Sequence, residues 1–449
     1  MTQDNPWVDR FDPEMSDAKL IARAKIDAVP LIGLGKEPKD VAMRHLRRGL
    51  DNVFVPTPQV CNVLRMLIGV AYGHALARYP SRMNFIRDAH REEIPLLSLA
   101  PICFSGLAGV GKTQLLLALT RIFPPDTQVT IAEHGTFPLV SYWYITIKAA
   151  DTLATLLRQL PNCNTNNDRR GAAIRQLYLR GTCIILLDEL QFLSQGAESN
   201  VSVAKLLMQL STLGVPVVYC SNFSLLHRLM RRPQEECQRL LVEPFTLHPE
   251  VQDSEGWSCT LKEKLRVAPE FSDLDPQEIS GLIYDYTFGI NRSITFLLSI
   301  AYGISREANA KLVSTEHIKR AYVSVQYSTF RRDVEILIEQ AITGTFPSDR
   351  RRMRQDLWCP LASRSFSIDV EKARKEAHEQ KVANANTTAM LSPNAKDALR
   401  ALGLTTAAAN DGRPTRAAPR PSATRAALLQ GAVDFENAFG KPDKGKEPR

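Results

Sequence analysis

The sequence lacks the features that mark membrane-spanning, secreted and zinc-binding proteins. It has no run of about 18 uncharged apolar residues, which a membrane-spanning helix would need. The N-terminus, MTQDNPWVDRFDPE, has no basic segment followed by an apolar one, so no signal peptide is predicted. None of the eight cysteines belongs to a Cys-x-x-Cys pair, and no nearby histidine completes a zinc pattern. We therefore expect a cytoplasmic protein with reduced thiols and no membrane partner.

The overall composition is that of an ordinary globular protein. Hydrophobic residues make up 44% and charged residues 23% of the 449 residues, so most of the chain can bury a core. The length corresponds to roughly three domains of about 150 residues each. The net charge of +8 permits a polyanionic partner but does not require one.

Short apolar runs alternate with helical stretches in the middle of the chain. These runs are nearly continuous in apolar residues, as in strands that are covered on both faces. They lie at 96–106, 138–147, 181–189 and 214–222. Strands that alternate with helices in this way predict an α/β core with a parallel sheet over residues 96–250.

The regions on either side of this core have different patterns. Residues 1–95 are predicted to form a helical and irregular N-terminal region. Residues 251–345 have helical periodicity throughout, with helix-start signals, and predict an all-helical subdomain. Residues 346–449 are predicted to form a basic and largely disordered tail.

Two segments of the tail differ in character. Residues 405–427 are rich in Ala, Pro, Thr and Arg and have no large apolar residue, so they cannot bury enough surface to fold. Residues 428–440 place Leu428, Phe435 and Phe439 at the spacing of one helical face. This segment is either a short partner-binding helix or an unstructured end, and the sequence leaves both open.

The phosphate-binding motif G-x-x-x-x-G-K-[ST] follows the first apolar run, at Gly106–Thr113. Its glycines let the loop turn and bring backbone N–H groups onto phosphate oxygens, and the next helix directs its positive end at the same anion. Lys112 is expected to reach the β and γ phosphates, and Thr113 to offer a hydroxyl to Mg²⁺. The predicted ATP site comprises Gly106, Leu107, Ala108, Gly109, Val110, Gly111, Lys112, Thr113 and Gln114.

Two carboxylates follow the third apolar run. Asp188 and Glu189 come directly after four aliphatic residues, as at a buried strand that ends beside a nucleotide. We expect Asp188 to hold the Mg²⁺ shell and Glu189 to polarise the attacking water. An acidic helix start would have the same pattern, but the phosphate-binding motif makes the catalytic interpretation stronger.

The fourth apolar run ends in two polar residues. A polar side chain at this strand tip can orient water or contact the γ phosphate. Asn222 is the first choice for this role and Ser221 the second. A plain turn is the alternative.

Several arginines follow the last predicted strand. An arginine here could reach the γ phosphate of a neighbouring subunit and stabilise the charge of the transition state. The candidates are Arg228, Arg231, Arg232 and Arg239, of which Arg231 and Arg232 are favoured. Arg292, in a Gly-x-x-Arg that opens a helix of the helical region, could fold back on the nucleotide. Each of these has a solvated surface arginine as its alternative.

These motifs together resemble those of an AAA+ ATPase, with a P-loop, an Asp-Glu Walker B motif, a sensor I strand tip and a helical lid whose arginine is sensor II. The sequence Leu187-Asp-Glu-Leu-Gln-Phe-Leu193 is similar to the Walker B motif of the TnsC/TniB transposition ATPases, relatives of MuB. Gly214-Val-Pro-Val-Val and Trp257 also resemble features of that family. The family often has Gly-Thr-Pro after the sensor strand, whereas this chain has Cys220-Ser-Asn. The resemblance covers roughly residues 50 to 340.

This resemblance implies an ATP-dependent protein that assembles as a ring or helical filament on double-stranded DNA. Such proteins link a target-site selector of the TniQ/TnsD type to transposase subunits, and ATP hydrolysis disassembles them. The loops that contact DNA in the family correspond to positions near Lys148, Arg169, Arg170 and Arg175. Contacts there would be independent of sequence and sensitive to salt. Ordinary surface charges are the alternative for these four residues.

Two other functions remain open. A helicase loader or origin-type AAA+ ATPase would carry a DNA-reading winged helix near the C-terminus. A signalling or defence NTPase scaffold would carry an effector domain or repeats. The sequence shows neither an effector domain nor repeats.

Overall fold

The computed structural model describes residues 5–97, 99–163, 168–194, 199–343 and 354–361. All of these lie within one compact unit, Met1–His378. The predicted segments at 405–427 and 428–440 fall outside the described residues. The eight cysteines all lie within the described residues and carry free thiols.

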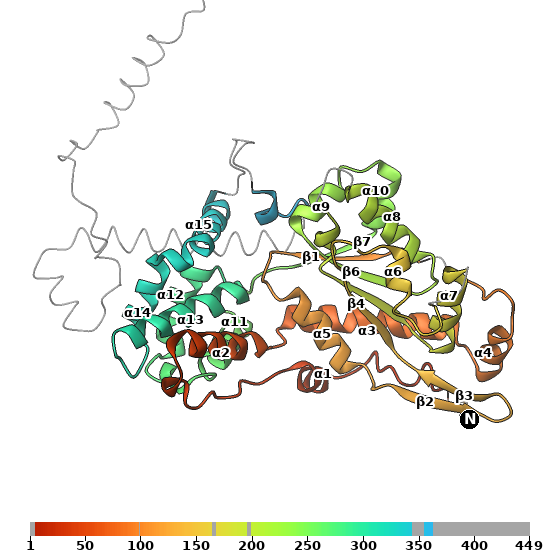
Figure 1. The fold of residues 1–449 in the computed structure, drawn as a ribbon, viewed down its shortest axis with the longest axis horizontal. Coiled ribbons are helices and arrows are strands. Elements are labelled where there is room, and N and C mark those ends of the chain that lie inside the picture. Colours follow the sequence, from red (N-terminus) through yellow and green to blue (C-terminus); the bar gives the residue numbers. More distant parts are fainter. Residues whose placement is uncertain (1–4, 98, 164–167, 195–198, 344–353, 362–449) are drawn as a thin grey trace, which may run out of the picture. The chain divides into compact units, whose positions relative to one another are not determined.

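A five-stranded parallel sheet forms the centre of the α/β core (Figure 1). Its strand order is β4-β5-β6-β1-β7, and every neighbouring pair is parallel. The strands are β1 (Ile102–Gly106), β4 (Tyr142–Thr146), β5 (Ile184–Asp188), β6 (Val217–Asn222) and β7 (Glu243–Leu247). The four apolar runs supply four of these strands, and every residue of β1 and β5 is buried. The prediction of a parallel α/β sheet is confirmed.

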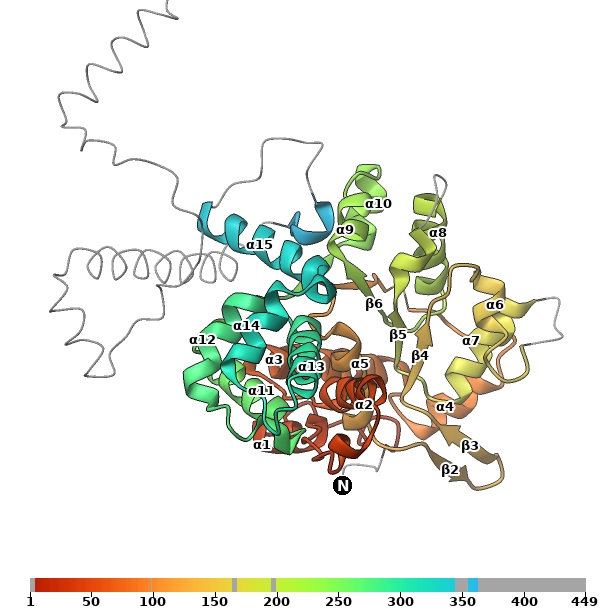
Figure 2. The same cartoon turned by 60° about the vertical axis from the view of Figure 1, so that its left-hand side comes forward.

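Helices cover both faces of this sheet (Figures 1 and 2). They are α1 (Asp17–Ala24), α3 (Pro58–Arg78), α4 (Arg82–Ala89), α5 (Lys112–Ile122), α6 (Leu153–Leu157), α7 (Arg169–Leu179), α8 (Ser199–Ser211), α9 (Phe223–Leu229) and α10 (Gln234–Leu240). Helices α3 and α5 lie on one side of the sheet, and α8, α9 and α10 lie on the other. Their apolar faces join one hydrophobic cluster with the strands.

Helix α3 is long and apolar enough to cross a membrane, by length and composition alone. The sequence contains no uncharged run of that length because Arg65 lies within this helix. Half of its most apolar stretch is buried inside the protein, and buried core helices pass the same test. Leu64, Leu67 and Ile68 pack in the cluster that surrounds the sheet.

The helical subdomain has its own hydrophobic cluster. Its helices are α11 (Glu255–Leu265), α12 (Pro276–Thr287), α13 (Asn291–Glu307) and α14 (Thr315–Val323), with short 3-10 helices at Pro269–Phe271 and Val325–Tyr327. Helix α15 (Ser328–Thr343) packs on α12 and α14, but its buried Val334, Leu337 and Ala341 join the core cluster. We call this subdomain the lid. Trp257 lies inside α11, is buried, and donates a hydrogen bond from Nε1 to Ser280 Oγ at 2.8 Å.

Helix α2 (Lys39–Asn52) belongs to the lid, although the sequence places it in the N-terminal region. Its buried residues Met43, Leu46 and Leu50 lie in the lid cluster, and α2 packs along α13. The expected N-terminal region therefore divides between two cores, because α1 and α3 pack against the α/β core instead. A short 3-10 helix at Leu34–Lys36 precedes α2.

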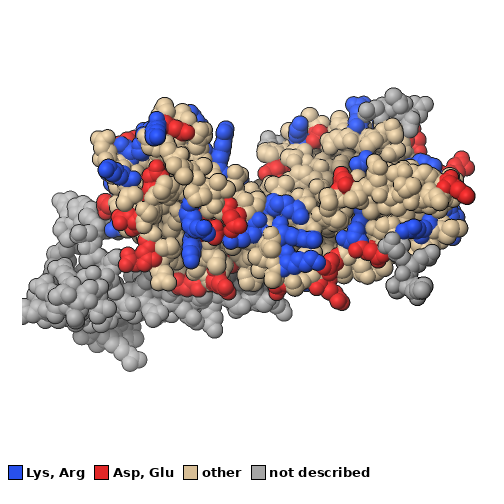
Figure 3. All heavy atoms as spheres, turned by 90° about the horizontal axis from the view of Figure 1, so that it is seen from below, with Lys and Arg blue, Asp and Glu red and all other residues tan. Residues whose placement is uncertain are grey.

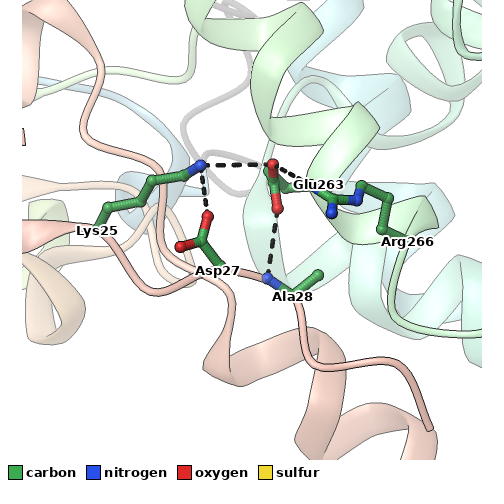
Figure 4. Close-up of polar contacts among 5 residues, drawn as sticks. All are labelled: Lys25, Asp27, Ala28, Glu263 and Arg266. Carbon is green, nitrogen blue, oxygen red and sulfur yellow. Dashed lines mark hydrogen bonds and ion pairs between the residues drawn. The ribbon is translucent and has the colours of Figure 1, made fainter. Parts of the chain in front are cut away.

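The segment that links α1 to α2 is tied to lid helix α11 by a buried carboxylate (Figure 4). Glu263 is 8% exposed and accepts hydrogen bonds from the backbone N–H of Ala28 at 3.3 Å and from Arg266 at 3.0 Å. Lys25 lies 3.4 Å from the same carboxylate and 2.5 Å from Asp27. We call this group the Glu263 anchor.

A short part of the expected disordered tail packs against the α/β core. Residues 354–361 contain a 3-10 helix, Gln355–Leu357, in which Leu357 is buried against the core cluster. The Nε2 atom of His227, on α9, lies 3.0 Å from the carbonyl oxygen of Trp358. These residues are an ordered part of the tail that was predicted to be largely disordered, because Leu357 supplies apolar surface that is buried.

Strands β2 (Thr127–Ile131) and β3 (Gly135–Leu139) form a separate two-stranded antiparallel sheet between α5 and β4. The sequence analysis did not predict this hairpin. In both views it extends away from the central sheet (Figures 1 and 2).

Candidate functional site

The predicted phosphate-binding loop connects β1 to α5, as its motif requires. Gly111 is the residue before α5 and has φ +119, and Gly109 has φ +80. Only glycine adopts these angles without strain. Gly106 leaves no room for a side chain either, because a Cβ there would lie 2.6 Å from the carbonyl oxygen of Leu247. The motif glycines thus meet a conformational or steric need.

Lys112 turns its ammonium group into this loop. Nζ donates to the carbonyl oxygens of Gly106 at 2.9 Å and Leu107 at 2.8 Å. Burial lowers the pKa of Lys112 to about 8, against weaker opposing effects of nearby acidic groups. No described carboxylate forms an ion pair with this lysine. The site therefore holds a desolvated cation that is ion-paired with no described carboxylate, which suits an anionic ligand.

The two predicted carboxylates lie at the end of β5, next to this loop in the fold. Asp188 is the last residue of β5 and is 3% exposed. Its Oδ2 accepts a hydrogen bond from Tyr144 on β4 at 3.1 Å, and burial raises the pKa of Tyr144, which keeps it a donor. Glu189 has φ +59, and its carboxylate accepts a hydrogen bond from Gln191. Tyr144 and Gln191 thus position both carboxylates.

The polar tip of β6 lies directly beside the phosphate-binding loop. In the β1–β6 register, Gly106 pairs with Asn222 and Ser105 with Ser221. Asn222 caps α9, since its side-chain oxygen accepts from the backbone N–H of Leu225 at 3.2 Å. Ser221 is fully buried. The partly exposed Asn222 is therefore the better placed of the two sensor I candidates.

The first residues of lid helix α13 contact the phosphate-binding loop. The backbone N–H of Arg292 donates to the carbonyl oxygen of Gly109 at 3.2 Å, and Asn291 Nδ2 donates to that of Val110, also at 3.2 Å. The backbone N–H groups at a helix N-terminus have no partner within the helix. Here the N–H of Arg292 and the side chain of Asn291 both bind the loop. Arg292 thus lies against the predicted phosphate-binding loop, and its role at a nucleotide stays a prediction.

The arginines after β6 differ in how they are engaged. Arg232 forms an ion pair with Glu236 at 2.8 Å. Arg231 is exposed and has no ion pair or hydrogen bond to another described side chain. Arg239 is also exposed, and Arg228 is half-buried. Of the two favoured candidates, Arg231 is the one free to reach a neighbouring subunit.

The four predicted DNA-binding residues lie in two places. Lys148 is exposed just after β4, and Arg169 and Arg170 begin α7. Arg175 is engaged within the chain, where it donates to the carbonyl oxygens of Ala89 at 2.7 Å and of Arg91 at 3.2 Å. Arg175 therefore has a structural role at the end of α4, whatever else it contacts.

A small cavity of about 40 Å³ adjoins the phosphate-binding loop. Its walls come from the loop, the segment before α3, the segment after β7 and the lid. Val110, Trp257 and Asn291 are among the lining residues, together with two half-buried ionisable residues, His248 and Glu250. Burial lowers the pKa of His248 and raises that of Glu250, so it favours the neutral form of both side chains.

Positive charge is not gathered into one band on the face shown in Figure 3. This view is from below Figure 1, and there Lys and Arg side chains lie near the middle among Asp and Glu. This face therefore has no continuous positive band of the kind that contacts the phosphate backbone of a DNA duplex.

The sequence analysis did not predict site roles for Tyr144, Gln191 and Asn291, which position the carboxylates and the loop. Gln191 lies two residues after Glu189, so its place in the motif was a usable signal. Tyr144 and Asn291 come close to the site only through strand pairing and lid packing, which a single sequence does not reveal.

No protein-family model matches this chain, and no curated protein matches it in sequence. Solved structures similar to it include Aeropyrum pernix ORC2 in its ADPNP–ADP complexes, with 16% identity, 66% of this chain and 78% of that chain covered, and a TM-score of 0.40. Cdc6p from Pyrobaculum aerophilum has 14% identity, 72% and 81% coverage and a TM-score of 0.38. Drosophila ORC bound to DNA has 15% identity, 85% and 89% coverage and a TM-score of 0.33.

These TM-scores are low, so what those proteins bind is not transferred to this chain. The fold rests on the chain's own features: a parallel sheet of five strands, a phosphate-binding loop between β1 and α5, and a helical lid that contacts that loop. This combination agrees with the fold class predicted from the sequence, an α/β core with a parallel sheet and a phosphate-binding loop, followed by a helical lid.

Proposed function

We propose that this chain is an ATP-hydrolysing AAA+ regulator of transposition of the TnsC/TniB type. It oligomerises on double-stranded DNA, links a target selector of the TniQ/TnsD type to the transposase, and disassembles when ATP is hydrolysed. One observation carries the ATPase proposal: Lys112, the Asp188–Glu189 pair and Arg292 adjoin the same loop. The transposition subtype is supported only by the sequence resemblance of residues 187–193, residues 214–218 and Trp257.

The residues at the loop fit ATP and Mg²⁺. Lys112 forms no ion pair with a carboxylate among the described residues, and loss of solvent around its ammonium group lowers its pKa. Asp188 and the hydroxyl of Thr113 are hard oxygen ligands of the kind that Mg²⁺ prefers. When bound, ATP supplies the γ-phosphoryl group and Mg²⁺ neutralises charge on the phosphates.

Each side chain then has a distinct task. Lys112 binds phosphate oxygens in place of the loop carbonyls that it contacts now. Glu189 accepts a proton from the attacking water, and its hydrogen bond from Gln191 holds the carboxylate before that step. Asn222 orients the water from the tip of β6. Arg292 stabilises negative charge from the lid.

In this proposal, bound ATP controls whether the subunits stay assembled. Arg231, exposed and unengaged, completes the site of an adjacent subunit, so the assembly holds together only while the γ phosphate is present. Hydrolysis removes that contact and releases the assembly. Lys148, Arg169 and Arg170 supply salt-sensitive contacts to the DNA backbone.

The test is a comparison of Glu189→Gln with wild type in DNA co-sedimentation and electron microscopy, with ATP, ADP or no nucleotide. Glu189→Gln should retain a DNA-bound assembly with ATP after wild type has released it. Lys112→Ala is the control, since it should fail to assemble with any nucleotide. The proposal fails if Glu189→Gln binds DNA no more durably than wild type.

An origin-type AAA+ ATPase is the second candidate, because the catalytic residues would serve it equally well. It requires a DNA-reading winged helix near the C-terminus, in a part of the chain that is mostly outside the described residues. Sequence-selective binding to one DNA site, lost on removal of residues 362–449, would favour this candidate over the transposition regulator.

A further inference from the structure

The β2–β3 hairpin has one unprotected strand edge. Within the described residues β2 pairs only with β3, and no backbone hydrogen bond joins the other edge of β2 to the rest of the protein. Exposed strand edges readily pair with extended chains, and most proteins block them with proline, charge or a bulge. The question is whether either edge of this hairpin is blocked.

Proline identifies which backbone groups point outward. In the antiparallel register, Gln128 pairs with Pro138 and Thr130 with Thr136. Alternate pairs exchange backbone hydrogen bonds, and Pro138 has no N–H to exchange. The pairs of Gln128 and Thr130 are therefore the ones whose backbone groups face away from the ladder.

The two edges consequently differ. The outer edge of β3 contains Pro138, which removes one donor, and the chain after β3 is covered, since Val140 donates to the carbonyl oxygen of Arg180 at 2.8 Å. The outer edge of β2 presents complete donor and acceptor groups at Gln128 and Thr130, which are both exposed. Strand β2 contains no proline, lysine or other charged residue.

The hairpin is anchored to the core cluster at both of its ends. A two-stranded sheet is only marginally stable by itself, but here Ile131 and Leu139 are buried in the core cluster. The ring of Phe137 packs edge-on against Phe85 of α4, with 5.0 Å between ring centroids. Ordering this edge in advance lowers the entropy lost when a partner strand binds.

Charge identifies the kind of partner. Asp126 precedes β2 and Glu133 lies in the turn after it, and both are exposed and form no ion pair with a described residue. The segment from Asp126 to Leu139 contains no Lys or Arg, so it does not suit a nucleic-acid backbone. Carboxylates at both ends of an uncharged strand complement an extended peptide with basic residues at both of its ends.

We infer that the outer edge of β2 is a docking site for an extended segment of a partner protein, which adds as a strand with basic residues flanking an uncharged centre. The backbone groups of Gln128 and Thr130 give affinity. Asp126 and Glu133 select the charge. This site is independent of the nucleotide site and of the proposed role in transposition.

The experiment uses the full chain and a fluorescent peptide, Lys-Lys-Thr-Val-Thr-Val-Thr-Lys-Lys. We expect it to bind in fluorescence anisotropy and to slow hydrogen exchange at the amides of Gln128 and Thr130. The same peptide, N-methylated at every central residue, should not bind, because it cannot form the ladder. Absence of binding by the unmodified peptide, or equal binding of both peptides, overturns the inference.

Two matched variants locate the edge. Thr130→Pro removes an outward N–H from β2 and should weaken peptide binding by about tenfold or more. Thr136→Pro makes the same change on β3 and should leave binding within about twofold. Asp126→Lys combined with Glu133→Lys keeps every backbone group and should also weaken binding, so the inference stays testable if either proline variant misfolds.

Analytical ultracentrifugation gives the remaining decisive outcome. A dimer of wild type that Thr130→Pro converts to monomer would show that this edge pairs with a second copy of the chain. That result would overturn the assignment of a basic partner peptide. Peptide binding that is lost in Thr136→Pro and retained in Thr130→Pro would equally overturn it.

Discussion

Replacing Gly109 with alanine should break the contact between the lid and the phosphate-binding loop. A Cβ at this position would lie 2.5 Å from Cβ of Arg292 and 3.3 Å from its Cδ and Nε atoms. The Cβ of Arg292 is fixed to the backbone of α13, so it cannot move aside without shifting the start of that helix. Gly109 also has φ +80, which strains any residue with a side chain.

The expected cost has two parts. A side chain in the left-handed region costs about 1–2 kcal/mol. Overpacking against α13 adds about 1–3 kcal/mol. Gly135→Ala is the matched control, because Gly135 has φ +95 but nothing lies within 4 Å of its added Cβ. It should cost only the first part, about 1–2 kcal/mol.

The measurement is urea unfolding of the nucleotide-free protein, with each variant compared with wild type. Gly109→Ala should lose more stability than Gly135→Ala, and Arg292→Gly should cost less in the Gly109→Ala background than in wild type, since it removes the opposing Cβ. Equal losses for the two glycine variants, or purely additive effects in the double variant, would refute the lid contact described above.

Three further predictions concern buried charge. The affinity for ATP should fall as pH rises through about 8, because the pKa of Lys112 is lowered to about 8 in the free protein and phosphate binding needs the charged form. Calorimetry at pH 8 in two buffers should show that the protein takes up protons when it binds ATP. A binding enthalpy that does not depend on the buffer would contradict this prediction. Glu263→Ala should cost about 2 kcal/mol in urea unfolding because it leaves the partners of a buried carboxylate unpaired, whereas Glu307→Ala, at an exposed ion pair, should cost less than about 1 kcal/mol; equal losses would rule out the Glu263 anchor. Burial lowers the pKa of His74 to about 4 from 6.5, so the unfolded chain binds more protons than the folded one between these pH values. The free energy of unfolding should therefore fall by about 3 kcal/mol as pH drops from 6.5 to 4. His74→Gln should flatten this part of the stability profile, and a slope that the substitution leaves unchanged would disprove the prediction.

The sequence predicted the elements that its own local pattern encodes. The four apolar runs, the phosphate-binding loop and the carboxylates after β5 are each marked by adjacent residues. The structure makes the runs neighbouring strands and places the loop and the carboxylates at the carboxyl ends of these strands. Strand β7 was missed because it contains Glu243 and Pro244, which argue against a central strand. The sheet order explains their presence, since β7 is an edge strand.

What the sequence did not predict is which elements pack together. Met43, Leu46 and Leu50 predict an amphipathic helix, but periodicity does not say which core buries its apolar face. The run at 138–147 is a similar case, because it spans both β3 and β4, and the break between them appears only when β3 pairs back with β2. Strand pairing decided the division of this run, and helix packing decided the placement of α2.

The placement of α2 in the lid has a consequence for synthesis of the protein. Arg47 of α2 donates a hydrogen bond to Ser299 of α13 at 2.7 Å, and the two residues are 252 positions apart. At about 5–20 residues per second, a ribosome takes roughly 13–50 s to make the second helix after the first. During that interval the apolar face of α2 has no permanent partner, so the nascent chain should be a chaperone client until α13 emerges.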